Sequence, residues 1–184
     1  MGNRLPAHNQ ETRFEQTVLP HLAAAYNLAR WLTRSDQDAE DVVQEAYLRA
    51  FRFFSGFHGG DSRAWLLTIV RNTSYTWLRQ KRAQDLTTEF DEELHSIDYE
   101  ASDPEWLLMQ RDGEQTLRAA LEGLPVEFRE AVVLRDLEGL SYKEIAVIAG
   151  IPQGTVMSRL SRGRKRLQRI LAPGPDKEVQ RELS

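Results

Sequence analysis

The chain has 184 residues and a formal net charge of −4; 41% of its residues are apolar and 28% are charged, a balance typical of a soluble globular protein with one or two domains. The absence of cysteine excludes disulfides, thiolate catalysis and Cys-ligated zinc. No apolar run approaches the roughly 18 residues of a membrane span, and residues 1–10 lack the apolar core of a secretory signal, so we expect no membrane insertion and a cytoplasmic location.

The net charge is the sum of three unlike segments. Residues 1–82 and 124–184 each carry a net charge of +3, whereas residues 83–123 carry −10. Within the last segment, residues 153–171 hold six basic side chains and no acidic one. A lone basic helix can be a solvated face, but two basic segments on either side of an acidic one favour binding to a nucleic acid.

The spacing of apolar residues is helical throughout, with no run that alternates as a strand does. Three helices are predicted in a first compact unit, residues 10–82: about 13–33 with a kink near Pro20, from after 35–38 to about 54, and about 63–82. Three glycines between the last two helices predict a loop over residues 54–62.

The acidic segment separates this unit from a second one. Residues 83–103 are poor in large aliphatic side chains and lack periodicity, which is typical of a flexible or weakly ordered linker. Asp103 and Pro104 predict a helix start, and residues 104–171 are expected to hold about four helices. Residues 172–184 are expected to be a frayed tail. The predicted fold class is all-α, with two small helical domains joined by the acidic linker.

The strongest local signal is a helix-turn-helix. Ser141 and Glu144 have the spacing of a capping box, in which each side chain accepts a hydrogen bond from the other residue's amide. Gly150 stands where a left-handed residue ends the first helix, and Pro152 opens the next. A capped helix, a glycine turn and a second, basic helix in this spacing are typical of a DNA-binding motif.

The basic second helix separates its side chains by face. At about 100° per residue, one narrow seam collects its apolar positions and glycine: Val156, Leu160, Gly163, Leu167 and Ile170. The opposite face is short and polar or basic: Ser158, Ser161, Arg162 and Lys165. Such a face suits a major groove, because small residues permit close approach, arginine reaches guanine edges and basic neighbours neutralise phosphates. A helix docked on an acidic protein or membrane surface explains the charge but not the turn before it.

Two sets of motifs resemble a known family. Leu124-Pro125, Arg129-Glu130-Ala131, the run 134–142 and Ile151-Pro152-Gln153-Gly154-Thr155-Val156 resemble region 4 of extracytoplasmic-function (ECF) sigma factors, which are initiation subunits of bacterial RNA polymerase. Asp38-Ala39-Glu40-Asp41-Val42-Val43-Gln44-Glu45, Phe51, Ala64-Trp65-Leu66, Ile69 and Arg71-Asn72 resemble region 2 of that family. The likeness covers about residues 14–82 and 104–171, in the family's order, with a linker between them.

The resemblance implies partners and a role for each surface: region 2 binds the polymerase clamp and opens the −10 element, and region 4 reads the −35 element. The implied polymerase-binding residues share one helical face: Asp41, Gln44, Glu45 and Leu48. The implied −10 residues are Phe57, Arg63, Arg71, Asn72, Arg79, Lys81 and Arg82. The implied −35 residues are Thr155, Met157, Ser158, Arg159, Ser161, Arg162, Lys165 and Arg166. Core RNA polymerase, promoter DNA and, from the family alone, an anti-sigma factor are the implied partners.

Some of these residues have a plainer interpretation. Asp38 as an N-cap, with Asp41 three residues later, fits the capping of a helix start, and capping can coexist with polymerase binding. Phe53 and Trp65 are each expected in the core. Phe57, between Ser-Gly and His-Gly-Gly, is hard to bury and is predicted to stack on a base.

Two other functions fit parts of the sequence. A helix-turn-helix regulator that does not bind polymerase explains residues 104–171 but not residues 10–82. A metal-dependent nuclease needs carboxylates that converge from separate elements, whereas those of residues 36–41 share one stretch. The four histidines lack metal-ligand spacing, and no GxxxxGK[ST] phosphate loop is present. We therefore predict a sigma factor that is not an enzyme and uses no cofactor or metal.

Overall fold

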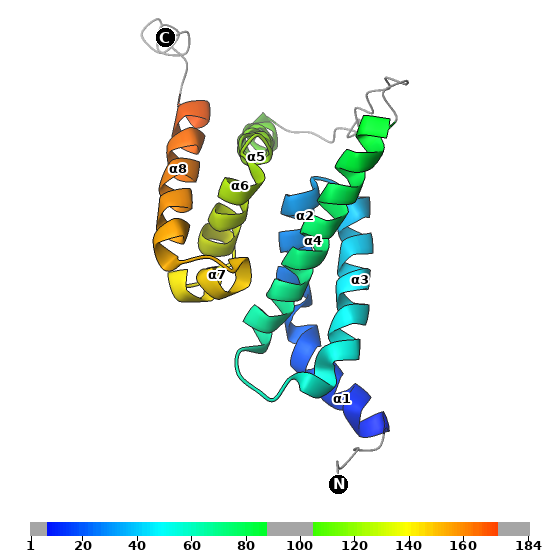
Figure 1. The fold of residues 1–184 in the computed structure, drawn as a ribbon. Coiled ribbons are helices and arrows are strands. Elements are labelled where there is room, and N and C mark those ends of the chain that lie inside the picture. The colour runs from blue at the N-terminus through cyan, green and yellow to red at the C-terminus, as the bar shows by residue number, and fades with distance from the viewer. Residues whose placement is uncertain (1–6, 88–104, 173–184) are drawn as a thin grey trace, which may run out of the picture.

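The computed structural model describes residues 7–87 and 105–172, which form helices and the short turns between them (Figure 1). Within these ranges there is no β-strand, so the predicted all-α class is confirmed for the part of the chain that is described. The predicted linker from residue 88 onward, the helix start at Asp103 and Pro104, and the tail from residue 173 lie outside it.

The first unit is built from four α-helices and two 3₁₀ turns. Their bounds are α1 Ala7–Val18, η1 Leu19–His21, α2 Leu22–Thr33, α3 Asp36–Phe53, η2 Phe54–Gly56 and α4 Ser62–Thr87. The kink predicted near Pro20 is the η1 turn, because proline cannot donate the backbone hydrogen bond that would continue α1. Helix α4 passes its predicted end at residue 82, since no glycine or proline interrupts it before Thr87.

The start of α3 differs from the prediction. Ser35, not Asp38, is the N-cap: its backbone is extended and its hydroxyl accepts a hydrogen bond of 3.2 Å from the Asp38 amide. Asp36 and Asp38 lie within the first turn, where their charge favours the helix dipole.

The core of the first unit lies between α2, α3 and α4, which pack closely on one another. Fully buried leucines of α2 and α4 meet small residues of α3: Leu28, Leu32, Leu66, Leu67, Ala39, Ala46 and Ala50. Alanines let the helices approach, so long leucine side chains can fill the space between them. Phe53, which was expected in this core, is 66% exposed; Phe54 occupies the buried position instead.

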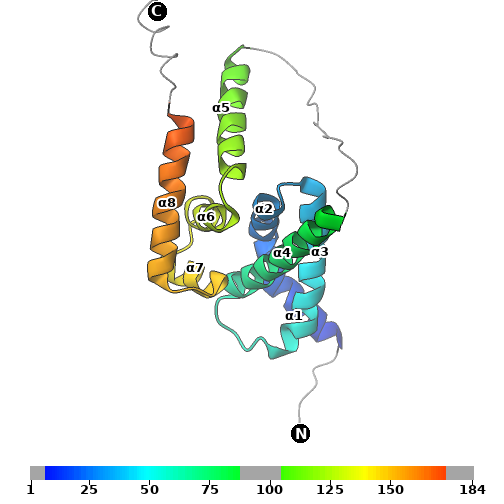
Figure 2. The same ribbon diagram turned by 45° about the horizontal axis from the view of Figure 1, so that its top comes forward.

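The second unit contains the predicted helix-turn-helix. Its bounds are α5 Glu105–Glu122, α6 Val126–Val132, a π-helical turn η3 Val133–Leu137, α7 Tyr142–Ala149 and α8 Gln153–Leu171 (Figure 2). The capping box is present, with hydrogen bonds of 2.7 Å from the Ser141 amide to the Glu144 carboxylate and 3.2 Å from the Glu144 amide to the Ser141 hydroxyl. Gly150 ends α7 with a φ of 65°, the left-handed conformation predicted for it.

The apolar seam of α8 rests on α6. Val156, Leu160 and Gly163 are buried and Leu167 packs against the core, as predicted, but Ile170 is 51% exposed. Gly163 permits the close approach: a β-carbon there would lie 3.0 Å from Val132 Cγ2.

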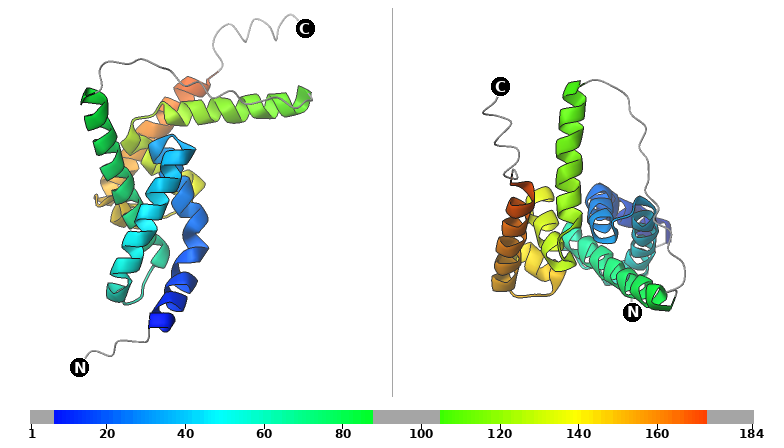
Figure 3. Two further views of the ribbon diagram at one scale, coloured as in Figure 1. Left: turned by 90° about the vertical axis from the view of Figure 1, so that its right-hand side faces the viewer. Right: turned by 90° about the horizontal axis from the view of Figure 1, so that it is seen from above.

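The two units pack against each other. Helix α4 lies on α7 and α2 lies on α6, so one continuous set of buried residues runs through both units. Figure 3 shows α5 projecting away from this assembly. The sequence carried no signal for this arrangement, which places the two basic helices α4 and α8 on either side of α6.

Candidate polymerase-binding and nucleic-acid-binding surfaces

The predicted polymerase-binding residues lie together on the outer face of α3. Asp41, Gln44, Glu45 and Leu48 are all exposed, and Leu48 keeps half of its surface in solvent. The Glu45 carboxylate accepts a hydrogen bond of 2.7 Å from Arg49, one turn later. An exposed leucine bordered by carboxylates offers an apolar anchor with a polar rim, the arrangement common in protein interfaces.

Beside this face is a groove that the sequence did not indicate. It has a volume of about 810 Å³ and lies between the η1–α2 segment and α3, and its apolar lining includes Leu19, Leu22, Val43 and Tyr47. Leu19 and Leu22 are 51% and 44% exposed. The sequence feature that could have indicated this groove is the pair of leucines on either side of the proline kink. Gln44 lies on both the groove and the predicted polymerase face, so the two form one surface.

Two of the predicted −10 arginines contact the second unit instead of facing solvent. Arg63 donates hydrogen bonds of 2.7 Å to the Glu138 carboxylate and 2.9 Å to the Glu138 carbonyl oxygen. Arg71 donates one of 2.6 Å to Glu130, and its guanidinium lies 4.4 Å from the centre of the Tyr75 ring. Burial acts to lower the pKa of Arg71, but the hydrogen bond and charge of Glu130 outweigh it and raise that pKa.

The remaining implied −10 residues of α4 do not all lie on one side of the helix, because Lys81 turns toward α3. Asn72, Arg79 and Arg82 are exposed, and the Asn72 side-chain oxygen accepts a hydrogen bond of 3.3 Å from Arg71. Lys81 lies 3.3 Å from the Asp38 carboxylate and over the Trp77 ring. Of these basic residues, Arg79 and Arg82 have no carboxylate partner in the described part of the chain, so the available cations lie toward the end of α4.

The aromatic side chains of the 54–62 loop are placed differently from the prediction. Phe57 is half-buried, with its ring 4.9 Å from Trp65 and 6.1 Å from Phe54 between ring centres. Trp65 also packs against the core, as expected. The η2 turn folds the chain back so that Phe57 covers the core, while Phe53 at the end of α3 points outward. Local sequence alone could not show which of the two would be covered.

The predicted −35 residues lie on α8. Six of them are exposed: Met157, Ser158, Ser161, Arg162, Lys165 and Arg166. Thr155 and Arg159 are half-buried, and Arg159 lies 3.8 Å from Glu130. The Arg166 guanidinium is 5.2 Å from the centre of the Phe128 ring. The exposed set forms a continuous polar and basic surface on the helix that follows the glycine turn.

Glu130 is a buried carboxylate that belongs to one of the sequence motifs but had no role predicted for it. Its side chain is 2% exposed, and it accepts hydrogen bonds from Arg71 and from the Tyr75 hydroxyl at 3.1 Å. Burial, and then the charge of Glu130, raise the pKa of Tyr75, so its hydroxyl remains a donor. The sequence feature that could have indicated this buried carboxylate is the charged Arg129-Glu130 pair within an apolar run.

Arg129 occupies the interface between the units. It is 2% exposed and donates hydrogen bonds of 2.8 Å, 3.2 Å and 3.4 Å to the carbonyl oxygens of Glu122, Leu124 and Leu32. Burial, reinforced by the charge of Arg34, lowers the pKa of Arg129 to about 10. These contacts tie the α5–α6 turn to the end of α2.

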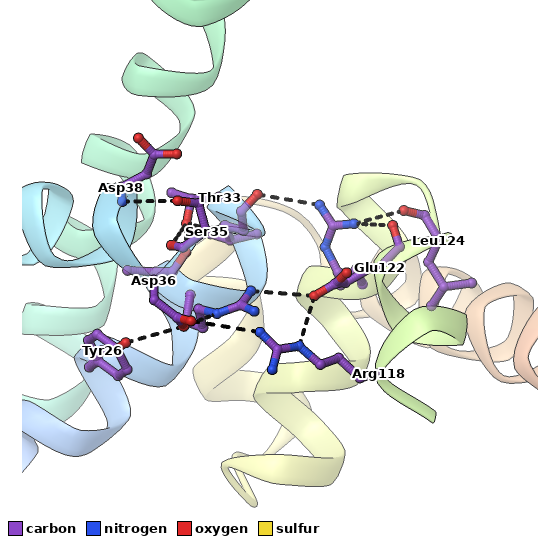
Figure 4. A network of polar contacts seen from close by, with 12 residues as sticks. Tyr26, Thr33, Ser35, Asp36, Asp38, Arg118, Glu122 and Leu124 are labelled. Carbon is purple, nitrogen blue, oxygen red and sulfur yellow. Dashed lines mark hydrogen bonds and ion pairs between the residues drawn. The ribbon is translucent and has the colours of Figure 1, made fainter. Parts of the chain in front are cut away.

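An ionic cluster continues this interface at its surface. Figure 4 shows Arg118 and Glu122 of α5 facing Asp36 at the start of α3. Arg30 of α2 contacts both carboxylates: it pairs with Asp36 and lies 3.4 Å from Glu122. No group of three or more His, Cys, Asp or Glu side chains suited to a metal occurs in the described ranges, nor does a helix long and apolar enough to cross a membrane.

Comparison with known proteins assigns both units. Residues 17–84 match the family described as Sigma-70 region 2, and residues 114–167 match Sigma-70, region 4. Over 162 residues the chain is 37% identical to the ECF RNA polymerase sigma factor SigE of Mycolicibacterium smegmatis, a match that covers 86% of this chain and 62% of that protein. It is 33% identical over 168 residues to the RNA polymerase sigma-H factor of Pseudomonas aeruginosa, covering 87% and 86%.

Solved structures agree with this assignment. The sigma factor RpoE of Bartonella quintana, determined in complex with the anti-sigma factor NepR, superposes with a TM-score of 0.70 at 33% identity, covering 86% of this chain and 96% of that one. CnrH, determined with the cytosolic domain of CnrY, has a similar fold, with a TM-score of 0.60 at 24% identity. The order of the two matched regions, the helix-turn-helix in the second and the identity to named sigma factors together show that the chain belongs to the ECF group of the sigma-70 family of RNA polymerase sigma factors.

Proposed function

We propose that this sigma factor binds core RNA polymerase through the α3 face, reads the −35 element with α8 and binds the −10 element with α4, and so directs and assists the start of transcription. The observation that carries the proposal is the exposed basic face of α8, in a chain whose other unit presents an acidic and apolar surface. A chain with both surfaces can hold the polymerase and the promoter at once.

The α3 face suits a helical partner on the polymerase. Leu48 and the apolar groove supply the area to be buried, and Asp41, Gln44 and Glu45 supply polar contacts at its edge. Charged rim residues steer association and fix register more than they add affinity, whereas buried apolar anchors carry the binding energy. We assign polymerase binding to the four predicted residues together with the groove.

The α8 face suits a major groove. Ser158 and Ser161 are small enough for close approach, and Arg162 projects from the same face with the reach for a bidentate contact to guanine. The neighbouring basic side chains are placed to neutralise phosphates, which positions the helix without reading sequence. One good bidentate contact discriminates its base by about 1–3 kcal/mol.

For the −10 element, α4 offers phosphate contacts and an exposed amide. Arg79 and Arg82 are exposed cations, and Asn72 can hydrogen-bond the edge of an unstacked base. The exposed ring of Phe53 is better placed to replace base stacking than the half-buried Phe57. Arg63 and Arg71 join this surface once they are released from the second unit.

Regulation and cellular role follow the same assignment. The relative RpoE is bound by an anti-sigma factor, and we infer that an anti-sigma factor also binds this chain, covering the α3 face or the basic helices. We propose that the protein acts in the cytoplasm and performs no catalysis of its own. A regulator that does not bind polymerase is not favoured, because the region 2 match covers residues 17–84.

The test is holoenzyme formation followed by transcription. The protein is mixed with core polymerase, analysed by gel filtration, and assayed by run-off transcription on a selected promoter library. Asp41→Lys with Glu45→Lys should abolish co-elution while far-UV circular dichroism is unchanged, because both side chains are exposed. Glu11→Lys with Glu15→Lys, two equal changes on exposed positions of α1, is the matched control and should still co-elute. Co-elution of the α3 variant would reject the assigned face.

A further inference from the structure

We propose that the packed arrangement of the two units is a closed state of the free chain. In this state Glu130 and Glu138 form ion pairs with arginines that are needed to bind −10 DNA. DNA therefore competes with these two carboxylates, and the units must separate before the DNA is bound. The inference rests on the proposed −10 role of Arg63 and Arg71. It gives Glu130 and Glu138 a function that is separate from DNA or polymerase contact.

Glu138 reaches from the second unit into the first. Its side chain is 8% exposed, and its carboxylate accepts hydrogen bonds from Arg63 at 2.7 Å and from the Asn27 side-chain amide at 3.2 Å, both of which belong to the first unit. Gly139, with a φ of 69°, turns the chain immediately after it. In the described part of the chain, this carboxylate has no hydrogen bond within its own unit. It therefore stabilises the contact between units.

Glu130 joins the two DNA-binding helices. It accepts hydrogen bonds from Arg71 and Tyr75 on α4 and lies 3.8 Å from Arg159 on α8. One residue from each proposed DNA surface thus meets the same carboxylate in a nearly dry site. While the units are packed, Arg71 is held by this carboxylate and is not free to reach a phosphate, whereas the contact of Arg159 lies within the second unit and does not depend on the packing.

The competition follows from the chemistry of arginine. Carboxylate and phosphate both present oxygen acceptors that match the guanidinium, and one N–H cannot serve both at once. An arginine that is paired with a glutamate in the closed state is therefore unavailable to a DNA phosphate. Because these pairs are shielded from solvent, breaking them leaves charges that water or DNA must satisfy, and DNA phosphates do so for the arginines.

Several other polar contacts between the units involve no residue assigned to DNA. Arg129 donates to Leu32, and Arg118 and Arg30 share Glu122 and Asp36. They stabilise the closed state without competing with DNA. Replacing Glu130 and Glu138 should therefore shift the equilibrium toward open chains by about tenfold, which corresponds to about 1.4 kcal/mol for the two pairs together, and leave a closed fraction.

The absence of cysteine makes the opening directly measurable, because two engineered thiols can be spin-labelled without removing any native one. Labels are placed at the exposed positions Gln16→Cys on α1 and Gln168→Cys on α8, and the distance distribution is measured by pulsed electron resonance. The wild-type background should give one dominant distance. E130Q/E138Q should add a longer, broader population of distances. E138Q alone removes one of the two ion pairs and should add a smaller population of this kind.

The matched control is E15Q/E127Q, which removes the same amount of charge from two side chains that take no part in the ion pairs between the units. Its distance distribution should equal that of the wild-type background. An unchanged distribution in E130Q/E138Q, with circular dichroism showing a folded protein, would overturn the proposal.

The competition itself is tested with a fluorescein-labelled single-stranded oligonucleotide of random sequence, titrated with the free chain at fixed salt. Apparent affinity scales with the fraction of competent chains, so E130Q/E138Q should bind about tenfold more tightly than the charge-matched E15Q/E127Q. Adding Arg63→Gln and Arg71→Gln should remove the gain. An equal gain in the control, or a gain that survives loss of the two arginines, would refute competition.

The experiments distinguish failure of the closed-state proposal from failure of the proposed sigma-factor function. If the wild-type chain and core polymerase never co-elute, the assignment as an active sigma factor fails, whereas the distance measurement on the free chain still reports the closed state. If holoenzyme forms and the distances do not change in E130Q/E138Q, the sigma-factor function stands and the closed-state proposal fails. Once bound to polymerase, E130Q/E138Q should transcribe within about twofold of wild type, because neither glutamate is assigned to DNA or polymerase.

Discussion

Gly163→Ala tests how the recognition helix is held. Gly163 lies in the middle of α8, where alanine would normally stabilise a helix by about 1 kcal/mol. Here the added β-carbon would lie 3.0 Å from Val132 Cγ2 and 3.4 Å from both Phe128 Cβ and the Phe128 carbonyl oxygen. Val132 is buried and β-branched, so its rotamer is restricted, and the carbonyl belongs to the backbone of α6. Neither neighbour can move without shifting a helix.

Overpacking of this kind costs about 1–3 kcal/mol, which exceeds the gain in helix propensity, so G163A should be destabilised by about 1 kcal/mol overall. Gly154→Ala is the matched control, because it also lies in α8 and its β-carbon would have no neighbour within 4 Å. G154A should equal or exceed the wild type in stability. Urea unfolding monitored by circular dichroism measures both.

The two variants also differ in DNA binding. A shift of α8 on α6 moves the whole −35 face, so G163A should weaken −35 recognition although the exposed residues of that face are intact. Stability of G163A equal to that of G154A would show that α6 yields easily, and the reasoning from close approach would be refuted.

Three further predictions concern single side chains. Arg162→Ala should cost about 1–3 kcal/mol in discrimination of a −35 site by gel-shift titration, whereas unchanged discrimination would reject the orientation of α8. Asn72→Ala should slow open-complex formation, followed with permanganate, more than it weakens duplex binding; equal losses would argue against a base contact. Ser141→Ala should destabilise the second unit by about 1 kcal/mol. The hydrogen bonds from Ser141 lower the pKa of Glu144. The stability that ionised Glu144 contributes is therefore present above its unfolded-state pKa and is lost as the pH falls through its folded-state pKa. Acid titration of the stability of wild type and variant measures this loss.

The features predicted correctly from sequence are those specified by neighbouring residues. The capping box at Ser141 and Glu144 and the left-handed turn at Gly150 depend on contacts a few residues apart, so their spacing was sufficient. The exposed face of α3 followed from helical periodicity alone. At the start of α3, by contrast, Ser35 and Asp38 can both cap a helix, and spacing could not decide between them.

The features that were missed depend on residues distant in the chain. Whether Phe53 or Phe57 is covered depends on where the η2 turn directs the loop, and both side chains have the same local character. The groove beside α3 requires two helices to meet, and the ion pairs of Glu130 and Glu138 require the two units to meet. Their partners Arg71 and Arg63 lie 59 and 75 residues earlier, which no periodicity can reveal.

The chemistry of the contact between the units bears on how they can separate. An interface of apolar side chains alone would expose its whole area to water on opening, at about 25 cal/mol for each Å². Many of the contacts here are ionic: Arg63 with Glu138, Arg71 with Glu130, and Arg30 with Glu122. Water hydrates both members of such pairs when they part, and the phosphates of DNA are better partners still for the arginines. Charged contacts thus allow a folded chain to hold its units together when alone and to release them to a more highly charged ligand.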